Sequence, residues 1–242
     1  MIDTHCHIDM YKNPLEIAKE CEKLGITTIG MTNLPSHFEL GYNHLLHLKR
    51  VRLALGMHPL YADLHEKEFS KFTENLFKTS FIGEIGLDFS KEGISTKDLQ
   101  IKSFTRILKT LEGKKKILSL HSRNAEKEVF NYLTEHKIKS AIFHWYSGSL
   151  GLIKDISNAG YFFSVNPAMV KSKSGNDVID KIPLANILTE TDGPFVKHNG
   201  REVRPKDISI VISFLSEKWS IGECEVKNII KNNFEKLILM IK

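Results

Sequence analysis

The chain has 242 residues, which exceeds the commonest domain size of about 100–150 but suits a single α/β barrel of about 250 residues. Hydrophobic residues make up 41% and charged residues 26%, a balance that excludes a disordered or fibrous protein. The formal net charge of +5 permits a polyanionic partner such as nucleic acid without requiring one. We therefore expect one domain over residues 1–242.

Short apolar segments rich in Ile, Val and Phe alternate with segments of helical period. In chain order, the expected strands are Met1–His5, Ile26–Met31, Val51–Gly56, Phe81–Leu87, Ile117–His121, Ala141–His144, Tyr161–Val165 and Asn186–Glu190. The expected helices include Pro14–Leu24, Thr96–Leu111, Ala125–His136, Leu150–Asn158, Pro205–Trp219, Glu223–Asn232 and Phe234–Ile241. Strands separated by helices imply right-handed crossovers and a parallel sheet, so the pattern predicts a (β/α)8 barrel of the TIM type. A Rossmann fold is less suitable, because the sequence lacks its G-x-G-x-x-G turn.

The cysteines and the amino-terminal segment indicate in which cellular compartment the protein works. Cys6, Cys21 and Cys224 are odd in number and lack a C-x-x-C spacing, which argues against a disulfide framework and a cysteine zinc site. The sequence shows no secretion signal and no uninterrupted apolar run of about 18 residues that would span a membrane. We expect a protein of the reducing cytoplasm with no membrane contact.

Residue types that ligate metals or bind phosphate recur at the carboxyl ends of the expected strands. In a barrel these ends form one face, where the active sites of such enzymes lie, so residues far apart in sequence would converge. The set comprises His5, His7, His58, Glu84, Asp88, His121, Arg123, His144 and Asp192. Convergence is the argument for function, because a single histidine is more often structural than a ligand.

Other conspicuous residues fall outside this pattern. Six histidines lie in expected helices or loops and are interpreted as structural or surface residues: His37, His44, His47, His65, His136 and His198. The basic run Lys114–Lys116 lies between a glycine and an apolar strand, which favours a solvated loop with no specific role.

The first expected strand ends in the sequence His5-Cys6-His7. Side chains at positions i and i+2 of a strand share a face, so both imidazoles would point into the barrel mouth and Cys6 toward the helices. The alternative is a polar terminal strand, but it does not explain Asp3 and Thr4 on a strand that must be buried on both sides. The spacing therefore predicts two ligands for one metal.

The fourth strand carries Glu84 in the segment FIGEIGLDF. A carboxylate among apolar residues is costly unless a cation or hydrogen bonds compensate its charge. A buried Arg or Lys is one such partner. The other is a pair of metals, because the two carboxylate oxygens can each hold one metal, about 3.5–4 Å from the other. We expect Glu84 to bridge two metals and Asp88 to support neighbouring groups.

The last three site segments follow strands five, six and eight. His121 and His144 end two of these strands, and a mixed set of imidazoles and carboxylates is permissive among Zn, Mg and Mn. Arg123 would bind phosphate or pair with a neighbouring acid. Asp192 would ligate a metal and accept a proton from water, whereas Glu190 lies one pleat deeper and is expected to be supporting or structural.

The motifs taken together resemble the TatD family of metal-dependent deoxyribonucleases. In order along nearly the whole chain they are H-x-H, G-x-H-P (56–59), G-E-I-G-L-D (83–88), H-S-R (121–123), F-H-W-Y-S-G (143–148) and E-T-D-G-P (190–194). The resemblance implies an amidohydrolase-like barrel that hydrolyses DNA phosphodiesters with two divalent metal ions, Mg, Mn or Zn.

The resemblance also implies roles for individual residues. One metal would be held by His5, His7, Glu84 and Asp192, and the second by Glu84, His121 and His144. His58 would contact the scissile phosphate or protonate the leaving oxygen, and Arg123 would bind phosphate. Trp145 and Tyr146 would stack on bases without sequence preference, or pack beneath the barrel rim.

Two other functions remain open from the sequence. The first is cleavage of a small ester, amide or lactone by an enzyme with the same type of barrel. Many such enzymes bridge their metals with a carbamylated lysine, however, whereas strand four offers Glu84. An assembly subunit of a larger complex is the other. The whole sequence is also similar to the TatD-like subunit of Qat anti-phage systems, which implies a bacterial defence role with partner subunits.

Overall fold

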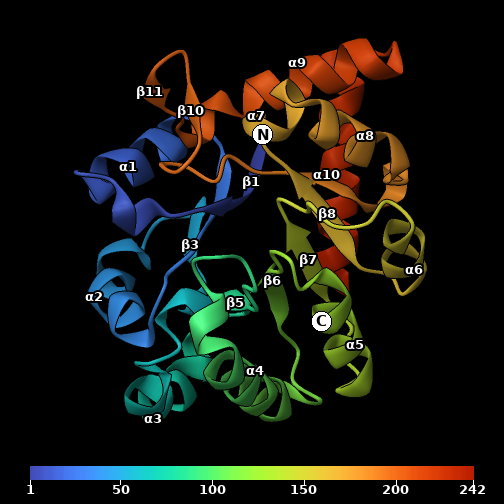
Figure 1. Ribbon diagram of the computed structural model, residues 1–242. Helices are drawn as coiled ribbons and strands as arrows, with labels where there is room; N and C mark the ends of the chain where they lie inside the picture. The colour runs from blue at the N-terminus through green and yellow to red at the C-terminus, as the bar shows by residue number, and fades with distance from the viewer.

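The computed structural model describes residues 1–242 and forms a barrel of short parallel strands ringed by helices (Figure 1). The barrel strands are β1 (Ile2–Cys6), β2 (Thr27–Gly30), β3 (Val51–Leu53), β4 (Leu55–Met57), β5 (Phe81–Gly86), β6 (Ile117–His121), β7 (Ala141–His144), β8 (Phe162–Val165) and β9 (Ile187–Thr189). β3 pairs with β2 and β4 pairs with β5, so these two strands are halves of one expected strand, divided at Ala54. The α/β barrel expected from the sequence is confirmed.

Side-chain hydrogen bonds close the ring between the first and last strands. The hydroxyl of Thr4 in β1 donates to the carbonyl of Thr189 in β9 at 3.1 Å, and the hydroxyl of Thr189 donates to the carbonyl of Ile2 at 2.6 Å. Threonine therefore links two strands that are 185 residues apart in the chain. This closure brings the ends of β1 and β9 together on one face.

The helices follow the strands in order. They are α1 (Pro14–Leu24), α2 (Pro35–Leu45), α3 (His65–Asn75), α4 (Lys97–Leu111), α5 (Glu126–Glu135), α6 (Leu152–Asn158), α7 (Pro167–Lys171), α8 (Lys173–Lys181), α9 (Ile208–Trp219) and α10 (Glu223–Leu239). α4 shows why these segments are helical, since its buried residues Phe104, Ile107, Leu108 and Leu111 recur at helical spacing. A small antiparallel hairpin, β10 (Lys197–His198) and β11 (Arg201–Glu202), occupies the segment after β9.

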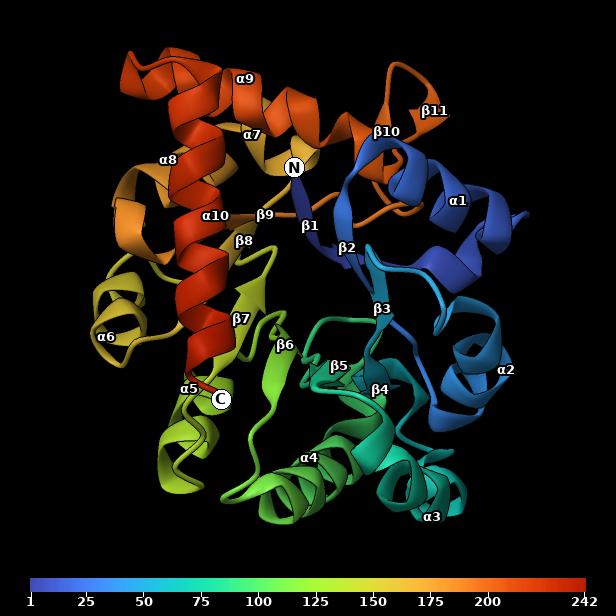
Figure 2. The same ribbon diagram turned by 180° about the vertical axis from the view of Figure 1, so that it is seen from behind.

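The carboxyl-terminal region corrects one expectation from the sequence. Two helices were expected over Glu223–Asn232 and Phe234–Ile241, but α10 is a single helix that runs beside β9 (Figure 2). Asn233 lies inside it, and its buried amide donates to the carbonyls of Leu184 at 2.7 Å and Ile187 at 2.8 Å. The residue between the two expected helices therefore lies within α10 and contacts the start of β9 and the turn before it.

The apolar core is one cluster of 53 buried residues contributed by the strands and the helices around them. Polar residues are buried mainly on the strands and at their ends, including Thr28, Ser119, Ser164 and Thr189. No helix is long and apolar enough to cross a membrane. The packing thus leaves a polar barrel mouth as the place for chemistry.

Gly56 in β4 is expected to tolerate no side chain. An added Cβ would lie 1.6 Å from the carbonyl oxygen of Thr32, so Gly56→Ala would force backbone apart and lower the free energy of unfolding by about 2–4 kcal/mol. At Gly222, where nothing lies within 4 Å, the same change should cost about 1 kcal/mol or less, because Ala is a poorer N-cap than Gly for α10. Urea unfolding of both variants measures this, and equal midpoints would contradict the close approach of β4 to Thr32.

Candidate metal centre

Glu84, near the end of β5, lies at the centre of the polar barrel mouth. Its carboxylate is only 2% exposed, and five imidazole nitrogens lie within 3.5 Å of it. Oε2 faces His7 Nε2 at 3.1 Å, His58 Nε2 at 3.4 Å and His5 Nε2 at 3.5 Å. Oε1 faces His121 Nδ1 at 2.6 Å and His144 Nε2 at 2.8 Å. The two oxygens of one carboxylate thus face two separate groups of histidines.

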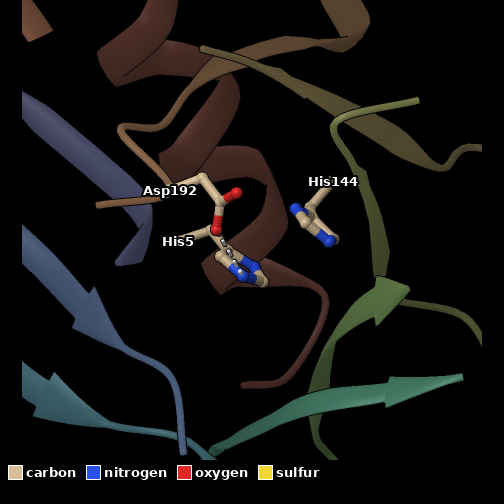
Figure 3. A group of neighbouring side chains, drawn as sticks. All are labelled: His5, His144 and Asp192. Carbon is tan, nitrogen blue, oxygen red and sulfur yellow. Dashed lines mark ion pairs between the residues drawn. The ribbon is translucent and has the colours of Figure 1, made fainter. Parts of the chain in front are cut away.

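Asp192 completes the group on the Oε2 side. Its Oδ1 lies 3.7 Å from both His5 Nε2 and His7 Nε2, which are themselves 3.2 Å apart. Figure 3 shows Asp192, His5 and His144 converging from the end of β9, from β1 and from β7. The rings of His5 and His144 stack with centroids 3.8 Å apart, so the two histidine groups are in contact.

The donor set fits divalent cations. No lysine or arginine pairs with Glu84 or Asp192, and their ion-pair partners are all histidines. Ligand atoms that share one ion at about 2.0–2.2 Å lie about 3.0–3.6 Å apart, close to the 3.1–3.7 Å found among His5, His7, Glu84 and Asp192. On the Oε1 side the 2.6 and 2.8 Å distances to His121 and His144 are those of hydrogen bonds, so there the residue types fit a cation but the spacing is shorter than a shared ion requires. Imidazole nitrogens with carboxylate oxygens suit Zn and Mn, and carboxylates suit Mg.

Other polar side chains orient the histidines. Ser119 in β6 lies 2.8 Å from His5 Nδ1, and Asp88 Oδ2 lies 2.7 Å from His121 Nε2, so each ring presents its other nitrogen to Glu84. Glu190 accepts hydrogen bonds from the Asn166 amide at 3.0 Å and the Trp145 backbone N–H at 3.1 Å, and it lies 3.6 Å from His144 Nδ1. Asp88 and Glu190 thus occupy the supporting positions expected from the sequence.

Sequence reasoning missed Ser119. A signal was present, because Ser119 lies two residues before His121 on the same strand and therefore on the same face. Serine is common throughout the chain, however, and only the fold shows that this hydroxyl meets a histidine from β1.

The two central carboxylates differ in their ionisation. Burial opposes the charge on Glu84, but His58, His144 and His121 hold its pKa well below the usual range. Burial raises the pKa of Asp192 to about 7 against the opposing influence of His144 and His7. A bound cation would lower the pKa of Asp192, since an opposite charge favours the ionised form. Glu84 is therefore the permanent anion of the site, and Asp192 is suited to accept a proton.

His58 follows β4 and has a fixed tautomer. The backbone N–H of Leu60 donates to His58 Nδ1 at 3.2 Å, so the neutral ring carries its own proton on Nε2. That Nε2 faces Glu84 Oε2, in a group that also contains His121. A neutral imidazole that accepts at Nδ1 has no free lone pair at Nε2, which argues against His58 as a ligand and for His58 as a donor.

The three residues predicted to contact the substrate differ in how exposed their side chains are. Arg123 is about half exposed and pairs with the exposed Glu92 at 3.3 Å, a surface contact that a phosphate can replace. Trp145 is 38% exposed beside His144, whereas Tyr146 is 1% exposed and its hydroxyl donates to the Ser149 carbonyl at 2.8 Å. A base cannot stack on a buried ring, so the packing interpretation holds for Tyr146, and of these two rings Trp145 is the one available for stacking. Phe195, which sequence reasoning missed, is a further exposed ring beside His7.

Ser119→Ala is expected to weaken metal binding by about 10- to 100-fold, because loss of the partner that orients a ligating histidine has effects of that size. Ser122→Ala is the matched control, since Ser122 is also buried beside β6 but its hydroxyl forms no hydrogen bond to the protein. Competition with a fluorescent zinc chelator measures both affinities. Equal affinities in the two variants would show that His5 is not a ligand oriented by Ser119.

Comparisons with known proteins found a matching family model, similar sequences and a similar solved structure. The family model described as TatD related DNase matches residues 2–239. An uncharacterised metal-dependent hydrolase of Methanocaldococcus jannaschii is 28% identical over 96% of this chain and 94% of its own. The deoxyribonuclease TATDN3 of Homo sapiens is 24% identical over 98% of this chain and 94% of its own. The crystal structure of YjjV, a TatD homologue of Escherichia coli, aligns with a TM-score of 0.86 and 25% identity, covering 98% of this chain and 97% of that one.

Proposed function

Because the chain belongs to the TatD-related DNase family of metal-dependent hydrolases acting on ester bonds, we propose that it hydrolyses DNA phosphodiesters by a two-metal mechanism. The observation that carries the proposal is the placement of Glu84, whose two oxygens face two groups of histidines. The deoxyribonuclease named among the relatives supports DNA as the substrate. We take residues 1–242 to act as one hydrolase domain.

The two groups of residues define the proposed cation sites. His5, His7, Asp192 and Glu84 Oε2 would hold one ion, and Glu84 Oε1, His121 and His144 the other. The groups are close enough that His144 also lies near His5 and Asp192, and His58 near Glu84 and His121. Bound divalent cations polarise a phosphate and lower the pKa of water. Buried imidazoles and carboxylates on rigid strand ends keep these atoms in place, and Ser119 and Asp88 fix two of the rings.

Asp192 is the proposed proton acceptor, and His58 is the proposed hydrogen-bond donor. Asp192 lies on the side of Glu84 that faces His5 and His7, and a cation held there would keep its carboxylate ionised and able to take a proton from water. The Nε2–H of the neutral His58 ring points to the same mouth and would donate a hydrogen bond to a phosphate oxygen or to the leaving oxygen, while the proton stays on the ring. Acceptor and donor thus flank one carboxylate.

Arg123 and Trp145 are the proposed substrate contacts. Arg123 can exchange its exposed partner Glu92 for a DNA phosphate. Trp145 follows His144 with a φ of +37°, a left-handed conformation that costs about 1–3 kcal/mol and occurs where surrounding structure enforces it. Its exposed ring would stack on a base of any identity, which supports cleavage without strong sequence preference.

The substrate class is tested with purified protein and a panel of substrates. End-labelled single- and double-stranded DNA and RNA, together with a small ester and a lactone, are incubated with Mg, Mn or Zn or with EDTA. We expect cleavage of DNA that EDTA abolishes, and little turnover of the ester and lactone. Turnover of the ester or lactone with every nucleic acid left intact would overturn the proposal in favour of a small-molecule hydrolase.

We also propose that the nuclease works in the reducing cytoplasm as part of a bacterial anti-phage system. The sequence resemblance to the TatD-like subunit of Qat systems supports the defence role, and three free cysteines support the compartment. The test is phage plating on bacteria that carry the protein with its neighbouring gene products. Protection that disappears with Asp192→Asn is expected, and protection unaffected by that change would point to assembly instead of cleavage.

A further inference from the structure

Five lysines gather at the barrel end opposite the metal centre. Lys114, Lys115 and Lys116 precede β6, Lys137 and Lys139 precede β7, and all five line one cavity of about 230 Å³. β6 and β7 are adjacent parallel strands, so the loops that lead into them lie side by side. The same two strands end at the predicted ligands of the metal centre. This lysine cluster therefore lies at the far end of the strands that carry those ligands.

No aspartate or glutamate side chain forms an ion pair with the lysine cluster. No aspartate or glutamate lines the cavity, and none of the five lysines forms an ion pair with one. The ammonium of Lys116 donates to the carbonyls of Leu76 and Thr79, both at 2.6 Å, and Lys115 donates to the carbonyl of Lys242. Burial and the neighbouring Lys114 lower the pKa of Lys116, as expected where like charges are crowded.

The lysine cluster is not the sole basic group of the surface. Lys197, Arg201, Arg204 and Lys206 line another cavity, but Glu202 lines it as well. The lysine cluster differs because no acidic residue lines its cavity.

We propose that the lysine cluster binds the phosphodiester backbone of a nucleic acid strand, as a second contact separate from the metal centre. Lysine is a flexible point charge that pairs with phosphates in many geometries, and phosphate contacts of this kind supply affinity without sequence specificity. The inference takes its ligand class from the proposed function, but it concerns binding and not cleavage. The lysine cluster would hold one part of a long nucleic acid strand while a distant part of the same strand reaches the metal centre.

The lining of the cavity favours nucleic acid over a protein partner. Protein interfaces are enriched in aromatic residues and arginine and depleted in lysine, whereas this cavity contains neither an aromatic residue nor an arginine. Of its apolar residues, Leu111, Leu118 and Ile138 are buried within the barrel wall. A partner therefore meets the five ammonium groups beside two apolar side chains, Met240, which is 44% exposed, and the partly exposed Ile241.

The test measures DNA binding without cleavage. Fluorescence anisotropy with labelled single-stranded DNA of about 40 nucleotides, in EDTA, compares wild type with a variant in which Lys114, Lys115, Lys137 and Lys139 are changed to Gln. At about 0.1 M salt we expect at least tenfold weaker binding, and a slope of log affinity against log salt that is smaller by about 2–3, from about 0.7 per lost phosphate contact. Cleavage of a short substrate with metal should stay unchanged.

A second variant of equal charge is the control. Lys19, Lys67, Lys127 and Lys154 are exposed and lie on four different helices, so changing them to Gln removes the same charge without removing a cluster. Equal weakening in both variants, or no DNA binding by wild type in EDTA, would overturn the proposal. So would binding of phosphatidylserine vesicles that depends on the cluster while DNA binding does not. If the cluster binds DNA but metal-loaded protein cleaves none, the proposed function fails and this inference stands.

Discussion

Asp192→Asn is expected to lower kcat for DNA cleavage by about 100- to 10,000-fold, the range for removal of a general base. Asn has the same shape but cannot accept a proton from water. The buried carboxylate lies 3.7 Å from His5 and His7, and burial raises its pKa to about 7. Loss of a metal ligand would lower metal affinity as well, so saturating metal is used.

Single-turnover cleavage of end-labelled DNA measures this loss. Asp155→Asn, an exposed change in α6, is the control and should leave the rate within about twofold of wild type, as usual for surface substitutions. A wild-type rate for Asp192→Asn at saturating metal would remove Asp192 from the mechanism.

Glu84→Gln is expected to affect both metal sites at once. The amide is neutral and binds cations weakly, and the structure places one Glu84 oxygen beside each histidine group. We expect metal content to fall from two ions per chain to about one or fewer, and DNA cleavage to fall by about 1000-fold or more. Elemental analysis after gel filtration measures the content.

Glu128→Gln in α5 is the matched change at an exposed glutamate and should retain wild-type metal content. Circular dichroism checks that the Glu84 variant is folded. A folded Glu84→Gln protein with two tightly bound ions would rule out the bridging role.

The barrel was predictable because its strands are short, apolar and regularly spaced. β6 and β7 lie where the sequence placed them, since the runs ILSLH and AIFH are bounded by polar loops. The merged helix α10 was not predictable, because the contact of Asn233 with the start of β9 depends on tertiary packing. The hairpin β10 and β11 was likewise missed in a segment without an apolar pattern.

The candidate site was predictable where it follows from the alternation of side chains along a strand. This alternation, together with the shared end of the parallel strands, placed His5, Glu84 and His144 at one barrel mouth, where the structure brings them together. It failed beyond the strand ends: the left-handed backbone of Trp145 ends the alternation, and Tyr146 turns into the core.

The resemblance already assigned His58 to the substrate and His121 to a metal, but the physical reason for the difference needed the structure. His58 and His121 are both histidines near strand ends, but only the hydrogen bond from Leu60 shows that His58 keeps a proton on Nε2. A backbone contact of this kind leaves no trace in the sequence.

The central claim is that Glu84 lies between two cation sites, and a crystal structure of the protein soaked in Mn²⁺ tests it most directly. The account predicts two anomalous-scattering peaks about 3.5–4 Å apart, one beside Glu84 Oε2 with His5, His7 and Asp192, and one beside Oε1 with His121 and His144. A single peak, or none in contact with Glu84, would contradict it.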